Sequence, residues 1–334
     1  MVVKNPLSRK MFFPLLILLA IAGFLTGVLC GSEFLSIKKL FFPEGKFSPT
    51  LLAKGRLLQS SGAFLAGSSL ALAGAAYQAV LRNILAEPYI LGVSSGSALG
   101  AAIAFISGAA MIFPGAVTLF AAAGALFALF LVLSLGFYRK NSSSDLLLSG
   151  VIVGTLLSSC LMAAVTLASS REMYSLTWFL LGDLSALDPA HLVFSGLSTL
   201  IFAFILFLFS SRANLLALGE EYAYSMGISP RKNAFWIILT ASLLAAHTVA
   251  LCGIIGFVGL IIPHIIRKLY KADNRKLFPA AFLAGGTFLL FCDTLSRSIF
   301  PEREIPIGVI TALVGGPLFL VLLRKKWNSG GKNE

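Results

Sequence analysis

Few residues of this chain have the types and spacing that enzyme chemistry requires. The sequence contains no HExxH motif, and no apolar run holds two carboxylates at helical spacing. His191 and His247 each lack a second histidine nearby, and the four cysteines form no CxxC pair. We therefore expect no catalytic residue, no metal site and no cofactor bound by this chain, so an enzyme is not predicted.

The ionisable residues within apolar runs are scarce. Asp293 lies four residues before Arg297, a spacing that allows an ion pair on one face of a helix. Glu87 stands beside Pro88 and is expected to cap the next helix. A transporter coupled to an ion gradient needs a relay of charges inside the membrane, and these residues offer little for one.

The chain also lacks a GxxxxGK[ST] phosphate loop, so it cannot hold ATP by that route. Uphill transport would then take its energy from ATP hydrolysed on a partner subunit. The alternative is an ion-coupled secondary transporter that works without an ATPase.

The composition indicates a membrane protein. Of the 334 residues, 57% are hydrophobic and only 12% are charged, whereas soluble domains carry roughly 25% charged residues. This excludes an ordinary soluble enzyme, a disordered regulator and a fibrous protein. The net charge of +12 comes from short basic clusters between apolar runs. Such clusters are typical of cytoplasmic loop anchors, so no nucleic-acid partner is expected.

Charged residues divide the chain into ten runs that could each cross the bilayer as a helix. When the chain alternates across the membrane from a cytoplasmic N-terminus, 18 of the 26 Lys and Arg residues fall inside and 8 outside. We therefore predict one all-α transmembrane domain over 1–334, N-in and C-in, multi-pass in the lipid bilayer of the inner or plasma membrane. The predicted spans are 11–30, 57–81, two within 88–138 cut at Pro114-Gly115, 146–168, 191–209, two within 234–266 cut near Gly253 and Gly256, 278–295 and 305–323.

The second span is unusually rich in small residues. Gly67 and Gly74 are seven residues apart and share nearly one helix face with Ala71. Close helix packing is one interpretation. Lining a pathway for a bulky substrate is the other, and Gly67, Ala71 and Gly74 are the candidate lining residues.

A cytoplasmic segment at 213–230 is too polar to span the membrane and too apolar to be a plain linker. Leu215, Leu218, Tyr222 and Met226 recur at helical spacing, and the segment is expected to form one or two short surface helices. Two acidic residues mark a helix start, and Gly227 is the predicted C-cap. Helices that rest on lipid usually carry Lys and Arg, and none lies between Arg212 and Arg231, so a protein partner is favoured.

Three stretches, residues 62–101, 253–297 and 304–326, together resemble the FecCD-type permeases. These are the membrane subunits of ATP-binding-cassette (ABC) importers for iron-siderophores, haem and vitamin B12. The resemblance implies a permease that takes up an iron chelate or a similar bulky cofactor by alternating access. It also implies a homodimer or paired permease, two cytoplasmic ATPase subunits that bind ATP-Mg, and an extracytoplasmic substrate-binding protein.

The resemblance also implies roles for individual residues. Arg56 and Arg297 match arginines that dock the binding protein, although Leu58 and Gln59 depart from the family's R-x-P-R pattern. Ser143 and Ser144 match the cytoplasmic gate. The residues that match the coupling helices, which contact the ATPase, are Leu215, Ala217, Leu218, Gly219, Glu220, Glu221, Tyr222, Met226 and Gly227.

Overall fold

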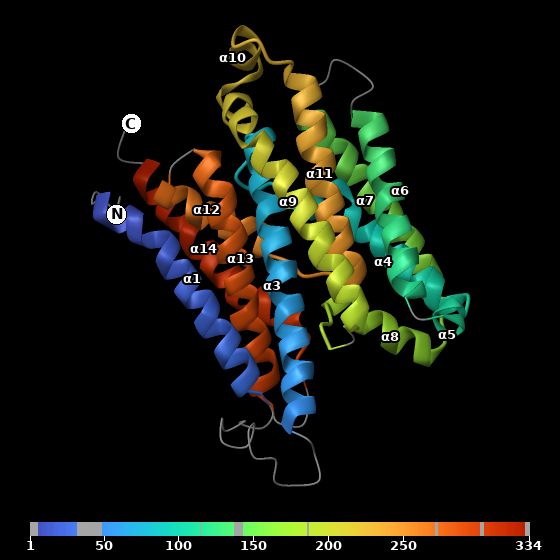
Figure 1. The fold of residues 1–334 in the computed structure, drawn as a ribbon. Coiled ribbons are helices and arrows are strands. Elements are labelled where there is room, and N and C mark those ends of the chain that lie inside the picture. The colour runs from blue at the N-terminus through green and yellow to red at the C-terminus, as the bar shows by residue number, and fades with distance from the viewer. Residues whose placement is uncertain are drawn as a thin grey trace.

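The computed structural model describes residues 6–31, 49–113, 115–136, 143–185, 187–270, 273–300 and 304–330, and within these ranges every regular element is a helix (Figure 1). In chain order the elements are α1 (Pro6–Leu29), α3 (Pro49–Val80), the 3-10 helix η1 (Pro88–Leu91), α4 (Val93–Ile106), α5 (Ala109–Ile112), α6 (Ala116–Gly136), α7 (Ser143–Val165), α8 (Ser170–Leu181), α9 (Pro189–Leu218), α10 (Glu220–Ser225), α11 (Pro230–Cys252), α12 (Val258–Tyr270), α13 (Asn274–Ser298) and α14 (Ile307–Gly330).

Seven of the described helices are long and apolar enough to cross a membrane, namely α1, α3, α6, α7, α9, α11 and α13. With α4, α12 and α14 they occupy the ten runs predicted from the sequence. Both predicted cuts are confirmed, because α6 begins at Ala116 and α11 ends at Cys252. The polytopic all-α prediction is therefore correct.

Two boundaries differ from the prediction. The span expected at 191–209 is part of a longer helix, α9, which continues to Leu218 and includes the start of the predicted surface segment. The linker after 168 contains the helix α8, which was not predicted. Ser169 and Glu172 form a capping box at its start, a reciprocal pair that fixes the first turn. The S-x-x-E pattern in the sequence is the signal that could have revealed α8.

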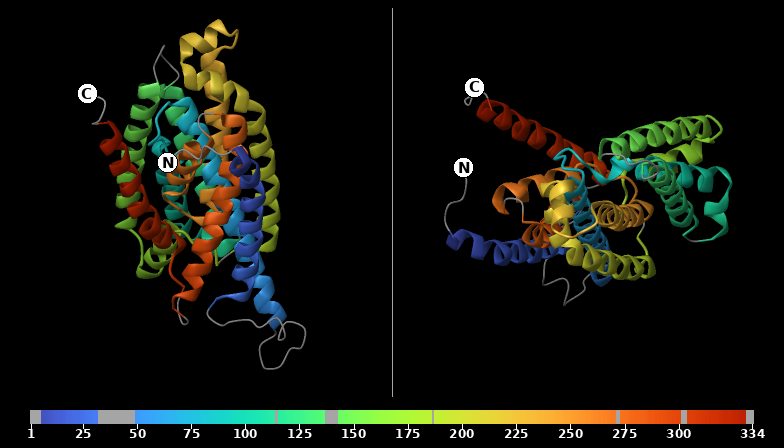
Figure 2. Two further views of the ribbon diagram at one scale, coloured as in Figure 1. Left: turned by 90° about the vertical axis from the view of Figure 1, so that its left-hand side faces the viewer. Right: turned by 90° about the horizontal axis from the view of Figure 1, so that it is seen from above.

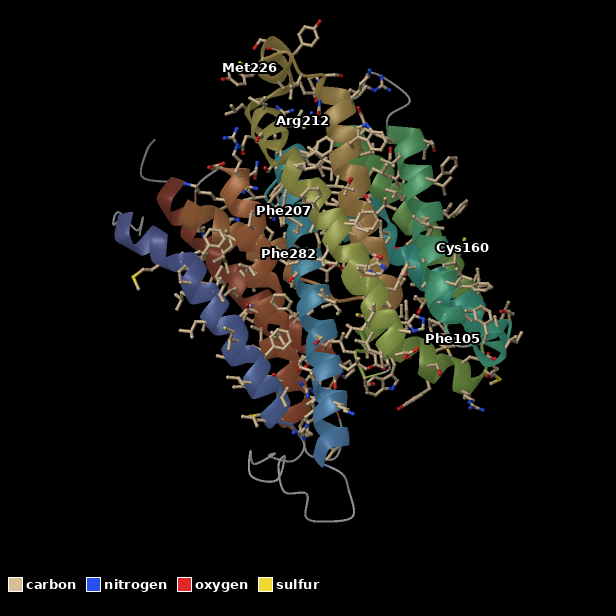
Figure 3. The ribbon with its side chains drawn as sticks, viewed as in Figure 1. Phe105, Cys160, Phe207, Arg212, Met226 and Phe282 are labelled. Carbon is tan, nitrogen blue, oxygen red and sulfur yellow. The ribbon has the colours of Figure 1, made fainter. Side chains whose placement is uncertain are left out.

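Helix α3 forms the centre of the bundle and packs along α13 (Figure 1). Within its apolar span 89% of the residues are buried, whereas α9 is 22% buried and exposes Phe204 and Leu208. Helices with exposed apolar faces suit contact with lipid, since their backbone groups are satisfied internally. Phe207 of α9 packs against Phe282 of α13, with ring centroids 6.2 Å apart (Figure 3).

The two ends of the bundle differ. Helix α10 projects at one end, called here the α10 end, and the start of α1 and the end of α14 lie toward it (Figures 1 and 2). Helix α8 and the start of α3 lie at the opposite end. This arrangement agrees with the predicted N-in and C-in topology. Seen from above, α7 and α14 lie along the same side of the bundle (Figure 2, right).

Candidate functional site

The predicted coupling segment folds as the end of α9 followed by the short helix α10. Gly219 has φ +125°, a conformation that ends α9, and α10 begins at Glu220 as predicted. Gly227 has φ +79°, and its N–H donates to Tyr224 O at 3.0 Å while Ile228 N donates to Ala223 O at 3.2 Å. This pair of bonds is a Schellman motif, which explains why a glycine stands at this position.

Part of the predicted surface helix is corrected by the structure. Leu215, Ala217 and Leu218 belong to the last turn of α9, so only the residues from Glu220 onward form a separate helix. The helical spacing of the apolar residues continued across Gly219, and this continuity concealed the break. The φ of +125° at Gly219 supplies the turn that the sequence pattern could not show.

The surface of α10 combines aromatic, sulfur-containing and acidic side chains. Ala223 is fully buried against the bundle, whereas Tyr222, Tyr224 and Met226 are 46%, 76% and 55% exposed. Glu220 and Glu221 are also exposed. Met226 stands at the outermost part of the α10 end (Figure 3). Tyrosine and methionine are enriched in protein interfaces, so this surface is suited to a protein partner.

The base of α10 is tied to the neighbouring helix α13 by polar side chains. Asn214 near the end of α9 donates through Nδ2 to Asp273 Oδ1 at 3.2 Å, and its Oδ1 accepts the N–H of Asn274 at 2.7 Å. Arg275 Nε donates to Ser211 Oγ at 2.9 Å. These hydrogen bonds join the end of α9, directly before α10, to the start of α13.

The two predicted docking arginines meet at the opposite end, around a pocket of about 240 Å³ that Gln59 and Glu304 also line. Arg56 Nη1 donates to the carbonyls of Val28 and Leu29 at 3.3 and 3.4 Å. These carbonyls lie in the last turn of α1, where intrahelical partners are lacking. Arg56 thus caps α1.

Arg297 is engaged within the subunit. Its Nη2 lies 2.5 Å from Asp293 Oδ2, which is the ion pair expected from their spacing, and 3.3 Å from Ser60 Oγ. Its Nη1 donates to Gly27 O at 3.2 Å. Arg56 is only 8% exposed and Arg297 only 3%. Both arginines therefore hold helices of this chain together, and their role in docking a binding protein stays a prediction.

The small-residue stripe of α3 is used for helix packing. A Cβ on Gly67 would lie 2.3 Å from Gly285 O, and one on Gly74 would lie 1.8 Å from Gly259 O. Ala71 has no exposed surface. In this structure α12 and α13 cover these three residues, and their role in lining a pathway stays a prediction.

The predicted gate residues Ser143 and Ser144 form the first turn of α7, and their side chains lie outside the described residues. Thr155 and Ser159 of α7, and Thr166 directly after its end, are exposed. Their hydroxyls donate to the carbonyls of Val151, Thr155 and Ala163 at 2.8, 3.0 and 2.7 Å. These hydroxyl donors are already satisfied, and they lie on a helix that also exposes apolar side chains such as Leu156 and Met162.

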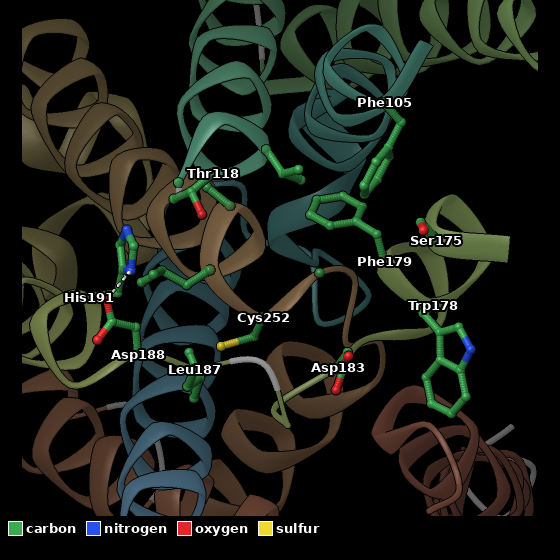
Figure 4. A pocket seen from close by; sticks show the side chains of 15 residues that line it. Phe105, Thr118, Ser175, Trp178, Phe179, Asp183, Leu187, Asp188, His191 and Cys252 are labelled. Carbon is green, nitrogen blue, oxygen red and sulfur yellow. Dashed lines mark ion pairs between the residues drawn. The ribbon is translucent and has the colours of Figure 1, made fainter. Parts of the chain in front are cut away.

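A pocket of about 330 Å³ lies among α8, the start of α9 and the end of α11 (Figure 4). Its acidic residues already have partners. Asp183 accepts Ser185 N and Oγ, both at 2.7 Å, and Asp188 lies 3.4 Å from His191 Nδ1. Across the described part of the chain, no group of three or more His, Cys, Asp or Glu residues could hold a metal ion.

These features agree with the comparisons to known proteins. The sequence model of the FecCD transport family matches residues 16–325. The chain belongs to the FecCD transport family. This FecCD permease is 34% identical to the uncharacterized ABC transporter permease protein YvrB of Bacillus subtilis over 91% of this chain and 90% of YvrB. It is 36% identical to the vitamin B12 import system permease protein BtuC of Yersinia enterocolitica over 81% of this chain and 80% of BtuC.

A solved structure has the same fold as this FecCD permease. It is an inward-facing ABC transporter provisionally assigned to the metal-chelate type, with a TM-score of 0.85 and 32% identity over 95% of this chain and 99% of its own. The chain is thus the multi-pass permease subunit of an ABC importer, and ATP is hydrolysed by a partner ATPase. This assignment excludes the ion-coupled alternative.

Proposed function

We propose that this permease imports a metal chelate, such as a ferric siderophore or haem, or a corrinoid such as vitamin B12, by alternating access. The exposed surface of α10 is the observation that carries the proposal. Tyr222, Tyr224 and Met226 project from the α10 end together with two glutamates, and α10 rests on the bundle through the buried Ala223. A helix so mounted can press on the bundle when its partner moves.

The partner at α10 is one of two cytoplasmic ATPase subunits, which bind ATP-Mg. Closure of the ATPases on ATP would displace α10, and the Asn214–Asp273 hydrogen bond would pass the displacement to α13. The segment 213–230 then acts as the coupling segment. Because the chain has no phosphate loop of its own, the free energy of transport enters through this contact.

The transport path lies between two copies of this chain, along the face that α7 presents. Helices α7 and α14 lie along one side of the bundle. The exposed residues of α7 include Thr155 and Ser159, and Thr166 follows directly after its end. Their hydroxyl groups are engaged with carbonyls of α7, so they make only weak contacts with a passing substrate. Ser143 and Ser144 at the start of α7 would form the cytoplasmic gate of this path.

Because the contacts in the path are weak, the cargo is selected by an extracytoplasmic binding protein at the opposite end. A path that bound the cargo tightly would slow its release, since a deep free-energy well must be climbed to leave it. The chemistry of the cargo is supported by the relatives, one of which is a vitamin B12 permease and one of which is assigned to the metal-chelate type.

The proposal is tested with the double variant Glu221→Ala/Met226→Arg in proteoliposomes that contain the ATPase and the binding protein. Uptake of radiolabelled cyanocobalamin and ferric siderophores is measured beside ATP hydrolysis. We expect uptake to be lost and hydrolysis to become independent of the binding protein. Lys232→Ala, which changes an exposed residue of α11 near the same end, should behave as wild type. Unchanged uptake in the double variant would refute the coupling role of α10.

A further inference from the structure

The connection between α11 and α12, residues 253–257, is irregular backbone inside an apolar bundle. The chain leaves α11 at Cys252 and starts α12 at Val258, and between them it crosses the interior of the bundle near α3 (Figure 1). Without water, each backbone N–H and C=O group in such a segment needs a partner from the protein. The partners of these groups show what holds the connection in place.

Two residues from the α3–α4 connection supply several of these partners. Tyr89 OH donates to Ile255 O at 3.1 Å and lies 3.2 Å from Ile255 N, which donates to it. Glu87 Oε1 accepts the N–H of Phe257 at 3.3 Å. The expectation that Glu87 caps the helix beside it is wrong, because η1 has no side-chain cap and the carboxylate reaches a segment 170 residues away.

Phe257 is the N-cap of α12 and its backbone is strained. Its carbonyl accepts the N–H groups of Leu260 and Ile261 at 3.2 and 2.9 Å, the first bonds of the helix. Its φ is +70°, a region that costs a bulky residue free energy and that persists only where its surroundings enforce it. The carboxylate of Glu87 holds the N–H of this residue at the positive end of the helix.

The same connection joins elements on both sides. Ile254 N donates to Phe179 O of α8 at 3.2 Å, and Asp183 N donates to Cys252 O at 2.9 Å. On the other side, α12 leads toward the α10 end, and the next residues begin α13, which is tied to Asn214. The strained junction at Phe257 thus connects α8, at the end of the bundle opposite α10, to α12 and α13, which a movement of α10 would displace.

We propose that Glu87 and Tyr89 are positioning residues for transport: they form a latch that holds the start of α12 in one conformation until the coupling segment moves it. The inference rests on the proposed ATP-driven movement of α10. Strain at Phe257 favours release of the latch, and the hydrogen bonds from Glu87 and Tyr89 oppose it. Loss of one hydrogen bond to a charged group shifts such a two-state equilibrium about 10- to 100-fold.

The experiment measures the position of α12 directly in the assembled transporter with its ATPase and binding protein in lipid. Spin labels are placed at Lys268, exposed near the end of α12, and at Leu57, exposed near the start of α3. Labelled chains are diluted with unlabelled ones so that most dimers carry one labelled copy. Distance distributions are recorded without nucleotide and with ATP and vanadate.

In wild type we expect one distribution without nucleotide and a shifted one with ATP and vanadate. Glu87→Leu should populate the shifted distribution without nucleotide, by about 10- to 100-fold more than wild type. Glu87→Gln keeps an acceptor oxygen and should restore the wild-type response. Leu85→Ala, an exposed substitution in the same connection, is the matched control. If Glu87→Leu folds poorly, Tyr89→Phe removes a single hydroxyl and should give the same change.

The outcomes separate the latch from the proposed function. If wild type responds to nucleotide and both Glu87→Leu and Tyr89→Phe respond identically, the latch is overturned and the coupling role of α10 stands. If wild type itself shows no change with ATP and vanadate, the proposed coupling fails and the latch with it. A merely structural role would lower the yield of each variant without changing the distribution of the folded fraction, and this result also overturns the latch.

Discussion

The buried ion pair of α13 offers the sharpest test of how this bundle is held together. Arg297→Leu would leave Asp293, which is 1% exposed, without its partner at 2.5 Å. The same change removes the bonds that the guanidinium makes to Gly27 O and Ser60 Oγ, which join α13 to α1 and α3. The expected consequence is a less stable permease rather than a purely local defect at the opposite end.

The magnitude follows from the geometry. At 2.5 Å and an effective dielectric constant of about 20, two unit charges attract by about 7 kcal/mol. Most of this is offset by the cost of removing both charges from water. Removal of one partner leaves the other buried and unpaired, which costs about 3–5 kcal/mol. Replacement of both by apolar residues, Arg297→Leu/Asp293→Leu, is expected to cost about 1 kcal/mol or less, because no charge remains to be desolvated.

The assay compares wild type, each single variant and the double variant as purified protein in one detergent. The temperature at which half of the protein remains monodisperse should fall for the single variants and recover for the double variant. Affinity for the binding protein is measured on the same samples. If the single variants are as stable as wild type, or the double variant is as unstable as they are, the reasoning about the pair fails. A stable double variant that no longer binds the binding protein would support the predicted docking role of Arg297.

Three further expectations concern single positions. Gly74→Ala should destabilise the permease by about 1–3 kcal/mol, since its Cβ would lie 1.8 Å from a carbonyl of α12, whereas Gly55→Ala in the same helix has open space and should be neutral or stabilising in the same thermal assay. Gly227→Ala should cost about 1–2 kcal/mol at φ +79° and lower binding-protein-stimulated ATP hydrolysis. Asn214→Ala removes the bonds to Asp273 and Asn274 and should reduce transport per ATP hydrolysed more than it reduces hydrolysis itself.

Much of the fold follows from hydropathy because the bilayer imposes one length on every span. The cut between α4 and α6, the break after Cys252 and the helix start at Glu220 are all marked by local residues, namely glycines and acidic groups. Local chemistry also identified the Asp293–Arg297 pair, because four residues make one helical turn. These predictions needed no knowledge of which helices are neighbours.

The contacts that the sequence did not predict depend on neighbouring helices. Arg297 matches a docking position in the sequence, but the carbonyl of Gly27 and the hydroxyl of Ser60 lie 270 and 237 residues away and turn it inward. Glu87 stands beside a proline that starts a helix, yet its partner is Phe257. No periodicity encodes such contacts, because each depends on how the helices are arranged in three dimensions.

Packing is uneven across the subunit, and this unevenness indicates where movement is cheapest. The span of α3 is 89% buried, whereas the span of α7 is 28% buried. Glycines of α3 and α13 bring the two backbones so close that a Cβ at these positions would clash. Displacing α3 would break close-packed contacts along its length, each worth little alone but large together. Displacing α7 would break few. In the proposed alternating-access cycle we therefore expect the close-packed contact of α3 with α13 to stay rigid. We expect movement in the sparsely buried α7, at the start of α12 and in the coupling segment at α10.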